Sequence, residues 1–208
     1  MRRLYSRFIF PRLLGVFCSR SFLARYRKAV LAEANGEVLE IGFGTGLNLP
    51  HYPAEKVAKI TAIDTNVGMR NLAHDRMMSS SIPVEHVLVG GDALPMPDNS
   101  YDTVVSTWVL CSIKENVQGA LKELYRVLKP NGKFIFLEHG LSPDPKVRAW
   151  QDRLNPIQVI IADGCHLNRD VKGLISQAGF QFEKLREYYL EKTPKVGGYM
   201  YEGVATKK

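Results

Sequence analysis

Residues 37–46 read Glu-Val-Leu-Glu-Ile-Gly-Phe-Gly-Thr-Gly, so a short apolar run leads directly into glycines at alternate positions. The run Glu37–Ile41 has the length and the side chains of a buried strand. Glycine adopts positive φ values without strain, and its missing side chain lets a ligand approach the backbone closely. The stretch therefore predicts a strand that ends in a ligand-binding loop, Gly42–Gly46. A purely structural turn between a strand and a helix is the alternative.

After this loop, short β-rich runs alternate with segments whose apolar residues have helical spacing. Such alternation indicates a Rossmann-like, doubly wound α/β fold with a mostly parallel sheet and helices on both faces. Ligands of such sheets bind beyond the carboxyl ends of the strands. Pro130-Asn131-Gly132 is expected to turn the chain, and Asn168 to cap the last helix. The expected strands are 59–63, 84–89, 102–106 and 133–137, and the expected helices are 66–79, 114–129 and 169–178.

Two acidic side chains follow the next two predicted strands. Asp64 ends the second strand, and Asp92 lies in Gly91-Asp92-Ala93 after the third. A carboxylate in the first position can accept both hydroxyl groups of a ribose, and one in the second can accept the amino group of an adenine. Each acid alone could equally cap a helix. Their placement after consecutive strands predicts that the site binds a nucleoside.

The loop spacing GxGxG differs from the dinucleotide spacing GxGxxG, in which a helix N-terminus faces a pyrophosphate. Pro50 and Pro53 follow so soon after the loop that no long helix is expected there. The predicted cofactor therefore has no phosphates, and Glu40 beside the loop suits a cation. S-adenosyl-L-methionine meets both conditions. A nicotinamide-dependent oxidoreductase is the alternative enzyme, and a non-catalytic cofactor-binding module is the alternative without chemistry.

Between about Gly36 and Phe180 the chain resembles the class I S-adenosylmethionine-dependent methyltransferases, especially the ubiquinone and menaquinone biosynthesis branch. Glu40–Gly46 matches the family's E/D-x-G-x-G-x-G loop, and Asp64 matches its ribose-binding acid. Tyr101 replaces the usual phenylalanine of the F-D-x-V strand, and Asn131 replaces a glycine of the L-K-P-G-G turn. The resemblance implies a seven-stranded sheet and the product S-adenosyl-L-homocysteine.

The resemblance and the loop positions together predict one set of cofactor-binding residues. Met69 belongs to it as an apolar position that lines the cofactor in this branch. Trp108 belongs to it because its segment lies over the methionine end of the cofactor in the family, although it could also fill the core. The predicted set is Glu40, Gly42, Phe43, Gly44, Thr45, Gly46, Asp64, Thr65, Met69, Gly91, Asp92, Ala93, Leu94, Thr107 and Trp108.

A finer resemblance concerns the methyl acceptor. Glu138-His139, Trp150–Pro156, Asp163–Arg169 and Gly198–Ala205 look like the methyltransferase-like-seven group, which comprises membrane-associated alkyl-thiol methyltransferases. Similar bacterial chains are close to small phospholipid N-methyltransferases. The resemblance implies methyl transfer to a small apolar or lipid-like acceptor, namely a thiol, an amine headgroup or a quinone-like ring.

His139 and His166 are the candidate catalytic residues. His139 follows the fifth predicted strand and could act as a base or orient the acceptor, and a histidine satisfied by the backbone is the alternative. His166 lies in a loop before the last predicted helix. Cys111 is expected to line the site rather than act as a nucleophile. No histidine pairs with a cysteine or an acid at metal-ligand spacing in the sequence, so no metal is predicted.

The N-terminal segment differs in composition from the rest of the chain. The formal net charge is +7, yet residues 1–32 alone hold eight basic residues and no acid. We expect a basic, apolar helical arm at 1–34 and the methyltransferase domain at 35–208. The arm could be a lid over the site, or residues 1–30 could touch an anionic membrane from the cytoplasm. Its apolar run is too short and too interrupted to span a bilayer, and no nucleic acid is expected as a partner.

Overall fold

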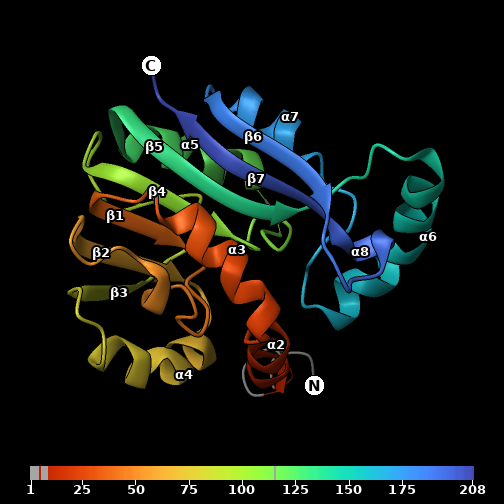
Figure 1. The fold of residues 1–208 in the computed structure, drawn as a ribbon, viewed down its shortest axis with the longest axis horizontal. Coiled ribbons are helices and arrows are strands. Elements are labelled where there is room, and N and C mark those ends of the chain that lie inside the picture. Colours follow the sequence, from red (N-terminus) through yellow and green to blue (C-terminus); the bar gives the residue numbers. More distant parts are fainter. Residues whose placement is uncertain (1–4, 6–8, 115) are drawn as a thin grey trace.

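The computed structural model describes residues 5, 9–114 and 116–208, which form one central sheet with helices against it (Figure 1). The strand order is β3-β2-β1-β4-β5-β7-β6, and only β7 runs antiparallel to its neighbours. The strands are β1 Gly36–Ile41, β2 Val57–Asp64, β3 Val84–Leu88, β4 Tyr101–Thr107, β5 Leu128–His139, β6 Gln181–Tyr189 and β7 Tyr199–Thr206. The helices are α2 Phe10–Cys18, α3 Ser21–Leu31, η2 Leu49–His51, α4 Val67–Met78, α5 Val117–Val127, α6 Pro145–Ile161, α7 Val171–Gln177 and α8 Lys195–Gly198.

This arrangement confirms the predicted doubly wound, mostly parallel seven-stranded sheet. The side chains of β5 show how one strand serves both faces. Phe134 and Phe136 join a core with α5 and α7, whereas Ile135 and Leu137 join a core with α3. Successive residues of a strand point to opposite faces, so β5 contributes apolar side chains to the hydrophobic core on each face of the sheet. Figure 1 shows α3 crossing one face while α5 and α7 cover the other.

Two sequence predictions about local structure need correction. Strand β5 begins at Leu128, before the predicted turn, and its pairing with β4 jumps from Leu128 to Lys133. Asn131, with φ at 62°, lets the intervening residues loop out without ending the strand. The last predicted helix is capped by Asp170 rather than Asn168, because the Asp170 side chain accepts a hydrogen bond from Gly173 N.

Helix α6 lies beyond the ends of the strands, on the side of the sheet where β5 ends (Figure 1). It is tied to the body by Gln151, its one buried residue, whose amide donates to the carbonyls of Gly140, Leu167 and Val196. Most other α6 side chains face outward. Within the described ranges, no helix is both long and apolar enough to cross a membrane.

Candidate active site

The glycine loop lies at the carboxyl end of β1, as predicted. Gly42, Gly44 and Gly46 all have positive φ values of 59° to 75°. A Cβ atom at Gly42 would overlap Val109, so the loop there lies hard against the segment that follows β4. A Cβ at Gly44 would meet only Gly42 O, at 3.8 Å, so the open side of the loop is at Gly44. This is the side on which a ligand can approach the backbone.

Glu40 is fully buried behind this loop. Its carboxyl group accepts hydrogen bonds from Asn48 Nδ2 at 2.8 Å and from Tyr52 OH at 2.7 Å. Burial raises the pKa of Glu40 to about 7, although both hydrogen bonds and the nearby Arg27 oppose the rise. Thr107 joins the network, because its Oγ1 accepts from Asn48 at 3.0 Å. Glu40 is therefore an acid that a bound cation could readily ionise.

Arg27 of α3 reaches the same network from the N-terminal segment. Its guanidinium donates to Asn48 Oδ1 at 2.8 Å and stacks over the Trp108 ring at 4.5 Å. It is buried, and burial lowers its pKa. Among the described residues no carboxylate lies within ion-pair distance of Arg27. A buried guanidinium with an amide partner can still take a carboxylate from a ligand.

Asp64, at the end of β2, holds the glycine loop in place. Its carboxylate accepts hydrogen bonds from Gly44 N and Asn66 N, both at 2.8 Å, and its remaining lone pairs can accept ligand hydroxyls. The residues predicted beyond β3 follow the neighbouring strand end. Asp92 and Ala93 are exposed there, and Leu94 is buried, with its backbone N–H donating to Glu123. Thr65 is exposed beside Asp64.

The segment after β4 is held from two sides. Trp108 has a φ of 54°, which is unusual for a residue with a side chain. The buried Glu138 accepts hydrogen bonds from Ser106 OH at 2.6 Å and from the N–H groups of Val109 and Leu110. Arg169 donates to the carbonyls of Leu110 and Ile113 from the opposite side. The segment over the predicted site is therefore fixed by one carboxyl group and one guanidinium.

His139, the last residue of β5, lies among cysteines. Its Nε2 is 3.2 Å from Cys165 Sγ, and Cys165 Sγ is 3.4 Å from Cys111 Sγ. The His139 Nδ1 is buried without a partner among the described residues. The contact with Cys111 and burial raise the pKa of Cys165 well above its usual range. Sequence spacing could not reveal this cluster, so the argument used above for predicting no metal does not hold in three dimensions.

His166 is next to this cluster in the chain, but its imidazole has another partner. Its Nδ1 is 3.2 Å from Asn155 Nδ2 of α6, and its backbone N–H donates to Cys111 O. Burial and the nearby Arg169 lower the pKa of His166, so its imidazole is neutral near pH 7. The structure therefore does not bring the two candidate catalytic histidines into one hydrogen-bonded pair.

One hollow brings together about half of the predicted cofactor residues. It is lined by Glu40, Gly42, Phe43, Gly44, Thr45, Met69, Thr107 and Trp108, and also by Gly15, Cys18, Arg27, Leu47 and Asn48. The second group was missed by sequence reasoning. The sequence does contain a signal for Arg27, because this basic residue lies on one helix face with Leu23, Val30 and Leu31, which are apolar and buried. The other predicted residues, namely Gly46, Asp64, Thr65, Gly91, Asp92, Ala93 and Leu94, do not line this hollow.

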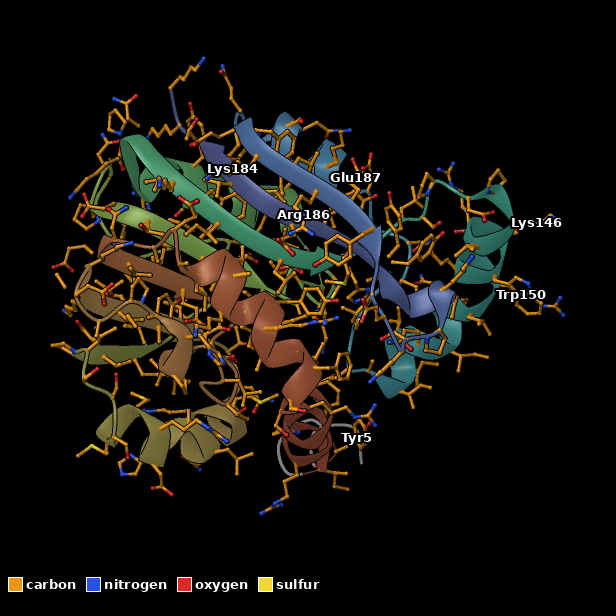
Figure 2. All side chains as sticks on the ribbon, viewed as in Figure 1. Tyr5, Lys146, Trp150, Lys184, Arg186 and Glu187 are labelled. Atoms are coloured by element: carbon orange, nitrogen blue, oxygen red, sulfur yellow. The ribbon has the colours of Figure 1, made fainter. Side chains whose placement is uncertain are left out.

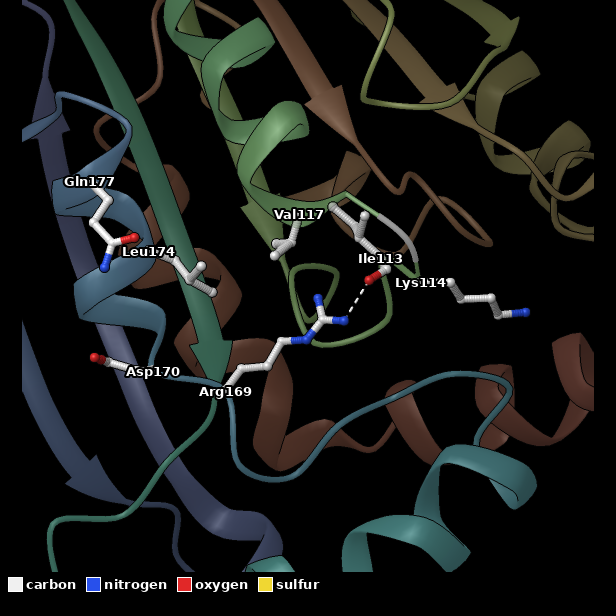
Figure 3. Close-up of a pocket in the computed structure, with 7 residues that line it drawn as sticks. All are labelled: Ile113, Lys114, Val117, Arg169, Asp170, Leu174 and Gln177. Atoms are coloured by element: carbon white, nitrogen blue, oxygen red, sulfur yellow. Dashed lines mark hydrogen bonds between the residues drawn. The ribbon is translucent and has the colours of Figure 1, made fainter.

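A second hollow lies elsewhere, between the start of α5 and α7 (Figure 3). Arg169 crosses it to reach Ile113 O, and Lys114 and Asp170 stand at its sides. It contains no residue of the predicted cofactor set. The first hollow therefore fits the expected ligand better.

The residues of the first hollow fit S-adenosylmethionine. Arg27 can take the carboxylate of its methionine part, and Glu40 can face its cationic groups. Gly44 leaves the loop backbone open, and Asp64 stands beside it as an acceptor. The short η2 helix after the loop confirms that no long helix begins there, as a pyrophosphate site would require.

Comparison with known proteins agrees with this geometry. Residues 39–136 match the family model of a methyltransferase domain. Thiol S-methyltransferase TMT1B of Rattus norvegicus is 34% identical over 185 residues, which cover 82% of this chain and 75% of the rat protein. Thiol S-methyltransferase TMT1A of Homo sapiens is 35% identical over 155 residues, which cover 72% of this chain and 62% of the human protein.

Solved structures show the same fold. The YcgJ protein of Bacillus subtilis superposes with a TM-score of 0.71 at 15% identity, covering 90% of this chain and 98% of that one. A phosphoethanolamine N-methyltransferase of Haemonchus contortus, solved with S-adenosylhomocysteine, also has a TM-score of 0.71 at 15% identity, covering 95% of this chain and 56% of that one. The fold, the loop geometry and the sequence relatives together show that the chain belongs to the class I S-adenosylmethionine-dependent methyltransferases.

Proposed function

We propose that this methyltransferase acts on the sulfur of small apolar thiols. The observation that carries the proposal is a buried group of sulfur and imidazole side chains, Cys111, His139 and Cys165, close to the hollow beside the glycine loop. Cys111 Sγ lies 3.8 Å from the carbonyl oxygen of Trp108, which lines that hollow. Two relatives at about one-third identity, the rat and human proteins above, are named thiol S-methyltransferases, which supports the same acceptor. An amine headgroup and a quinone-like ring remain the other two acceptors to be tested.

The chain's own residues would hold the cofactor at three points. Arg27 binds its carboxylate, Glu40 faces its ammonium and sulfonium charges, and Asp64 accepts the ribose hydroxyls. When bound, S-adenosylmethionine supplies an electrophilic methyl group, whose bond to the sulfonium breaks as the acceptor sulfur forms a new one, leaving S-adenosylhomocysteine. Trp108, which has a positive φ and lines the hollow, would help to exclude water from it when the cofactor is bound.

The acceptor thiol must lose its proton, because the thiolate is the nucleophile and a free thiol has a pKa near ~8.5. His139 is the proposed catalytic residue for this step, since it is buried at the carboxyl end of β5 with one ring nitrogen unpartnered. His166 stays a second proposed catalytic residue on the acceptor side. Alignment and exclusion of water supply the rest of the rate.

The test is an acceptor screen with S-adenosylmethionine labelled in its methyl group. The panel contains alkane thiols of rising length, phosphatidylethanolamine vesicles and a demethylated quinone. We expect labelled thioether from the thiols and little label in the other two. Label in the lipid or quinone but not in any thiol would overturn the proposal. Binding of S-adenosylhomocysteine with no transfer to any acceptor would favour a non-catalytic module.

We also propose that the enzyme touches anionic membrane surfaces, through α6 as well as the N-terminal segment. The outward face of α6 carries Trp150, Ile157, Ile160 and Ile161, each more than half exposed. Figure 2 shows Trp150 and Lys146 pointing away from the body. The charges on this face, Lys146 and Arg153, are positive, which suits anionic headgroups rather than a neutral apolar partner.

The N-terminal segment lies beside this face. Tyr5 OH donates to Ile161 O at 2.6 Å, which places Tyr5 against the end of α6. Much of the predicted contact region 1–30 is described by the structure, but Arg2, Arg3 and Arg7 lie outside the described residues. The proposal therefore rests on α6, and the arm extends the same surface.

A further inference from the structure

Three side chains from three separate elements converge beneath the segment that follows β4. Cys111 comes from that segment, His139 from the end of β5 and Cys165 from the loop after α6. Their ligand atoms all lie within 4.8 Å of one another. Cys165 Sγ is the centre of the group, at 3.4 Å from Cys111 Sγ and 3.2 Å from His139 Nε2.

These distances suit a tetrahedral zinc ion better than a disulfide. Zinc binds sulfur at about 2.3 Å and imidazole nitrogen at about 2.0 Å, so its ligand atoms lie roughly 3.5 to 3.8 Å apart. The distances from Cys165 Sγ to Cys111 Sγ and to His139 Nε2 each need to change by only a few tenths of an ångström, and the third pair already lies within 4.8 Å. A disulfide would bring Cys111 and Cys165 to about 2.05 Å and would give His139 no part.

The charges also fit a divalent soft metal. Two thiolates and a neutral imidazole balance the charge of Zn²⁺, so the complex can be buried without a net charge. Gln158 Nε2 donates to Cys165 Sγ at 3.7 Å, which would support a thiolate there. Arg169 is close enough to interact electrostatically with both cysteines. Apart from Nε2, the His139 ring has no hydrogen-bond partner among the described residues, so a metal bond would fix its orientation.

The cluster borders the cofactor hollow. Cys111 lies three residues after Trp108, which lines the hollow, and Cys18, which also lines it, is near enough to Cys165 for an electrostatic interaction. Three protein ligands leave the fourth position of a tetrahedral ion open, as in catalytic zinc sites.

We propose that Cys111, His139 and Cys165 form a Zn²⁺ site whose open position binds the acceptor thiol as a thiolate. The role of the open position rests on the thiol acceptor proposed above, whereas the metal site itself does not. A thiol that coordinates zinc gives its proton to solvent, because the ion lowers the thiol pKa. His139 then promotes loss of the thiol proton by binding the zinc ion, and it does not itself accept that proton. The thioether product carries no charge and binds zinc weakly, so it can leave.

The metal site is tested by titrating reduced, metal-free enzyme with Co²⁺, which reports thiolate coordination by its charge-transfer absorption, and then displacing it with Zn²⁺. We expect one ion per chain. Cys111→Ser and Cys165→Ser should lose most of the absorption, and His139→Gln should weaken metal binding at least tenfold. Cys18→Ser is the matched control and should keep both the charge-transfer absorption and the metal affinity of the wild type.

Absence of stoichiometric binding by the wild-type chain would overturn the metal site, and so would full absorption in Cys165→Ser. Circular dichroism of each variant shows whether it is folded, and His139→Gln keeps the proposal testable if a cysteine variant fails to fold.

The open position is tested without S-adenosylmethionine, so that its outcome is independent of methyl transfer. Adding an alkane thiol to the Co²⁺-loaded chain should increase the charge-transfer absorption by the share of one further thiolate, whereas the matching alcohol should not. An unchanged spectrum would overturn thiol coordination. Methylated thiols in the acceptor screen together with an unchanged spectrum would keep the proposed function and refute this role of the metal.

Discussion

Glu40 illustrates how a single buried carboxyl group can make cofactor binding depend on pH. Its pKa of about 7 in the absence of ligand arises mainly from burial. The ionised form of Glu40 binds a cationic ligand more tightly than the neutral form does, so the carboxyl group must lose its proton before or as the ligand binds. Below pH 7 this loss costs free energy that reduces the affinity.

We therefore expect the affinity for S-adenosylhomocysteine, which carries an ammonium group, to fall about tenfold between pH 8 and pH 6. Calorimetric titration at several pH values measures this. Glu40→Gln should bind more weakly at pH 8 and lose most of the pH dependence, whereas Glu55→Gln, at an exposed position, should behave like the wild type. A wild-type affinity that is flat over this range would refute the role of Glu40.

The same residue affects stability with a defined sign. The folded pKa of about 7 lies above the ordinary value of 4.5. The folded chain therefore holds this proton where the unfolded chain has lost it, and the contribution of Glu40 to stability falls as pH rises from about 4.5 to 7. Urea unfolding of Glu40→Gln should show a weaker fall over that window than the wild type.

Asp64→Ala should lower the affinity for S-adenosylhomocysteine about a hundredfold or more. The change removes the acceptor proposed for the ribose and the anchor of Gly44 N, and each charge-assisted hydrogen bond contributes about 1.5–3 kcal/mol. Asp75→Ala on α4 is the control. Unchanged affinity in a folded Asp64→Ala protein would contradict the ribose assignment.

The sequence was sufficient for site residues that follow one another along the chain and insufficient for those that meet only in space. Gly42–Gly46 and Asp64 could be predicted because a strand end and the next residues determine their positions. Arg27 and Cys18 reach the hollow from the N-terminal helices, so their place in the site depends on how those helices pack, although Arg27 is marked as a cation on an apolar helix face. The grouping of His139 with two cysteines depends on how three elements dock, which spacing along the chain does not record.

At the level of elements, the attachment of α6 to the rest of the domain depends on the side chain of Gln151. Gln151 is fully buried and bonds four backbone groups, since its Oε1 also accepts from Ser142 N at 2.9 Å. Replacing it by an apolar side chain would leave these groups without partners, at about 1–3 kcal/mol each when they stay buried.

Gln151→Leu should therefore lower the free energy of unfolding by about 3 kcal/mol or more, measured by urea denaturation. Gln177→Leu, the same change at an exposed position of α7, is expected to have little effect. Equal stability of the two variants would show that the contacts of Gln151 do not anchor the helix.

Element prediction worked best where periodicity was strong. The apolar face of α5 marked the helix correctly, and the strands from β1 to β4 lie within one or two residues of their predicted bounds. Strands β6 and β7 were expected only through the family resemblance. β6 is an edge strand whose sequence, QFEKLREYY, alternates poorly because several outward positions are charged. Helix α6 was not predicted either, because its apolar residues face outward and Pro156 lies within it.

At the level of the whole molecule, the outward face of α6 should control membrane association. We expect Ile157→Asp with Ile160→Asp to reduce sedimentation with anionic vesicles at least tenfold, because each apolar side chain contributes about 1.5–3 kcal/mol when buried. Met78→Asp on α4 is the matched control, since Met78 is even more exposed. Lys146→Gln should reduce binding about fivefold, and only to anionic vesicles.

Sedimentation of the double variant at the wild-type level would remove α6 from the proposed membrane surface. Equal binding of the wild type to neutral and anionic vesicles would show that Lys146 and Arg153 do not contribute. Neither outcome touches the proposed methyl transfer, which is measured with soluble thiols.

The burial of Arg27 in the cofactor hollow makes helix α3 both a wall of the binding site and part of the segment next to the proposed membrane surface. We therefore expect ligand occupancy and docking of that segment to be thermodynamically linked, and any such linkage is reciprocal. If bound cofactor raises the affinity for vesicles by some factor, then vesicle binding raises the affinity for the cofactor by the same factor. The amide protons of α2 and α3 should exchange more slowly once S-adenosylhomocysteine binds, and methylation would then be fastest where the lipid already holds the enzyme closed.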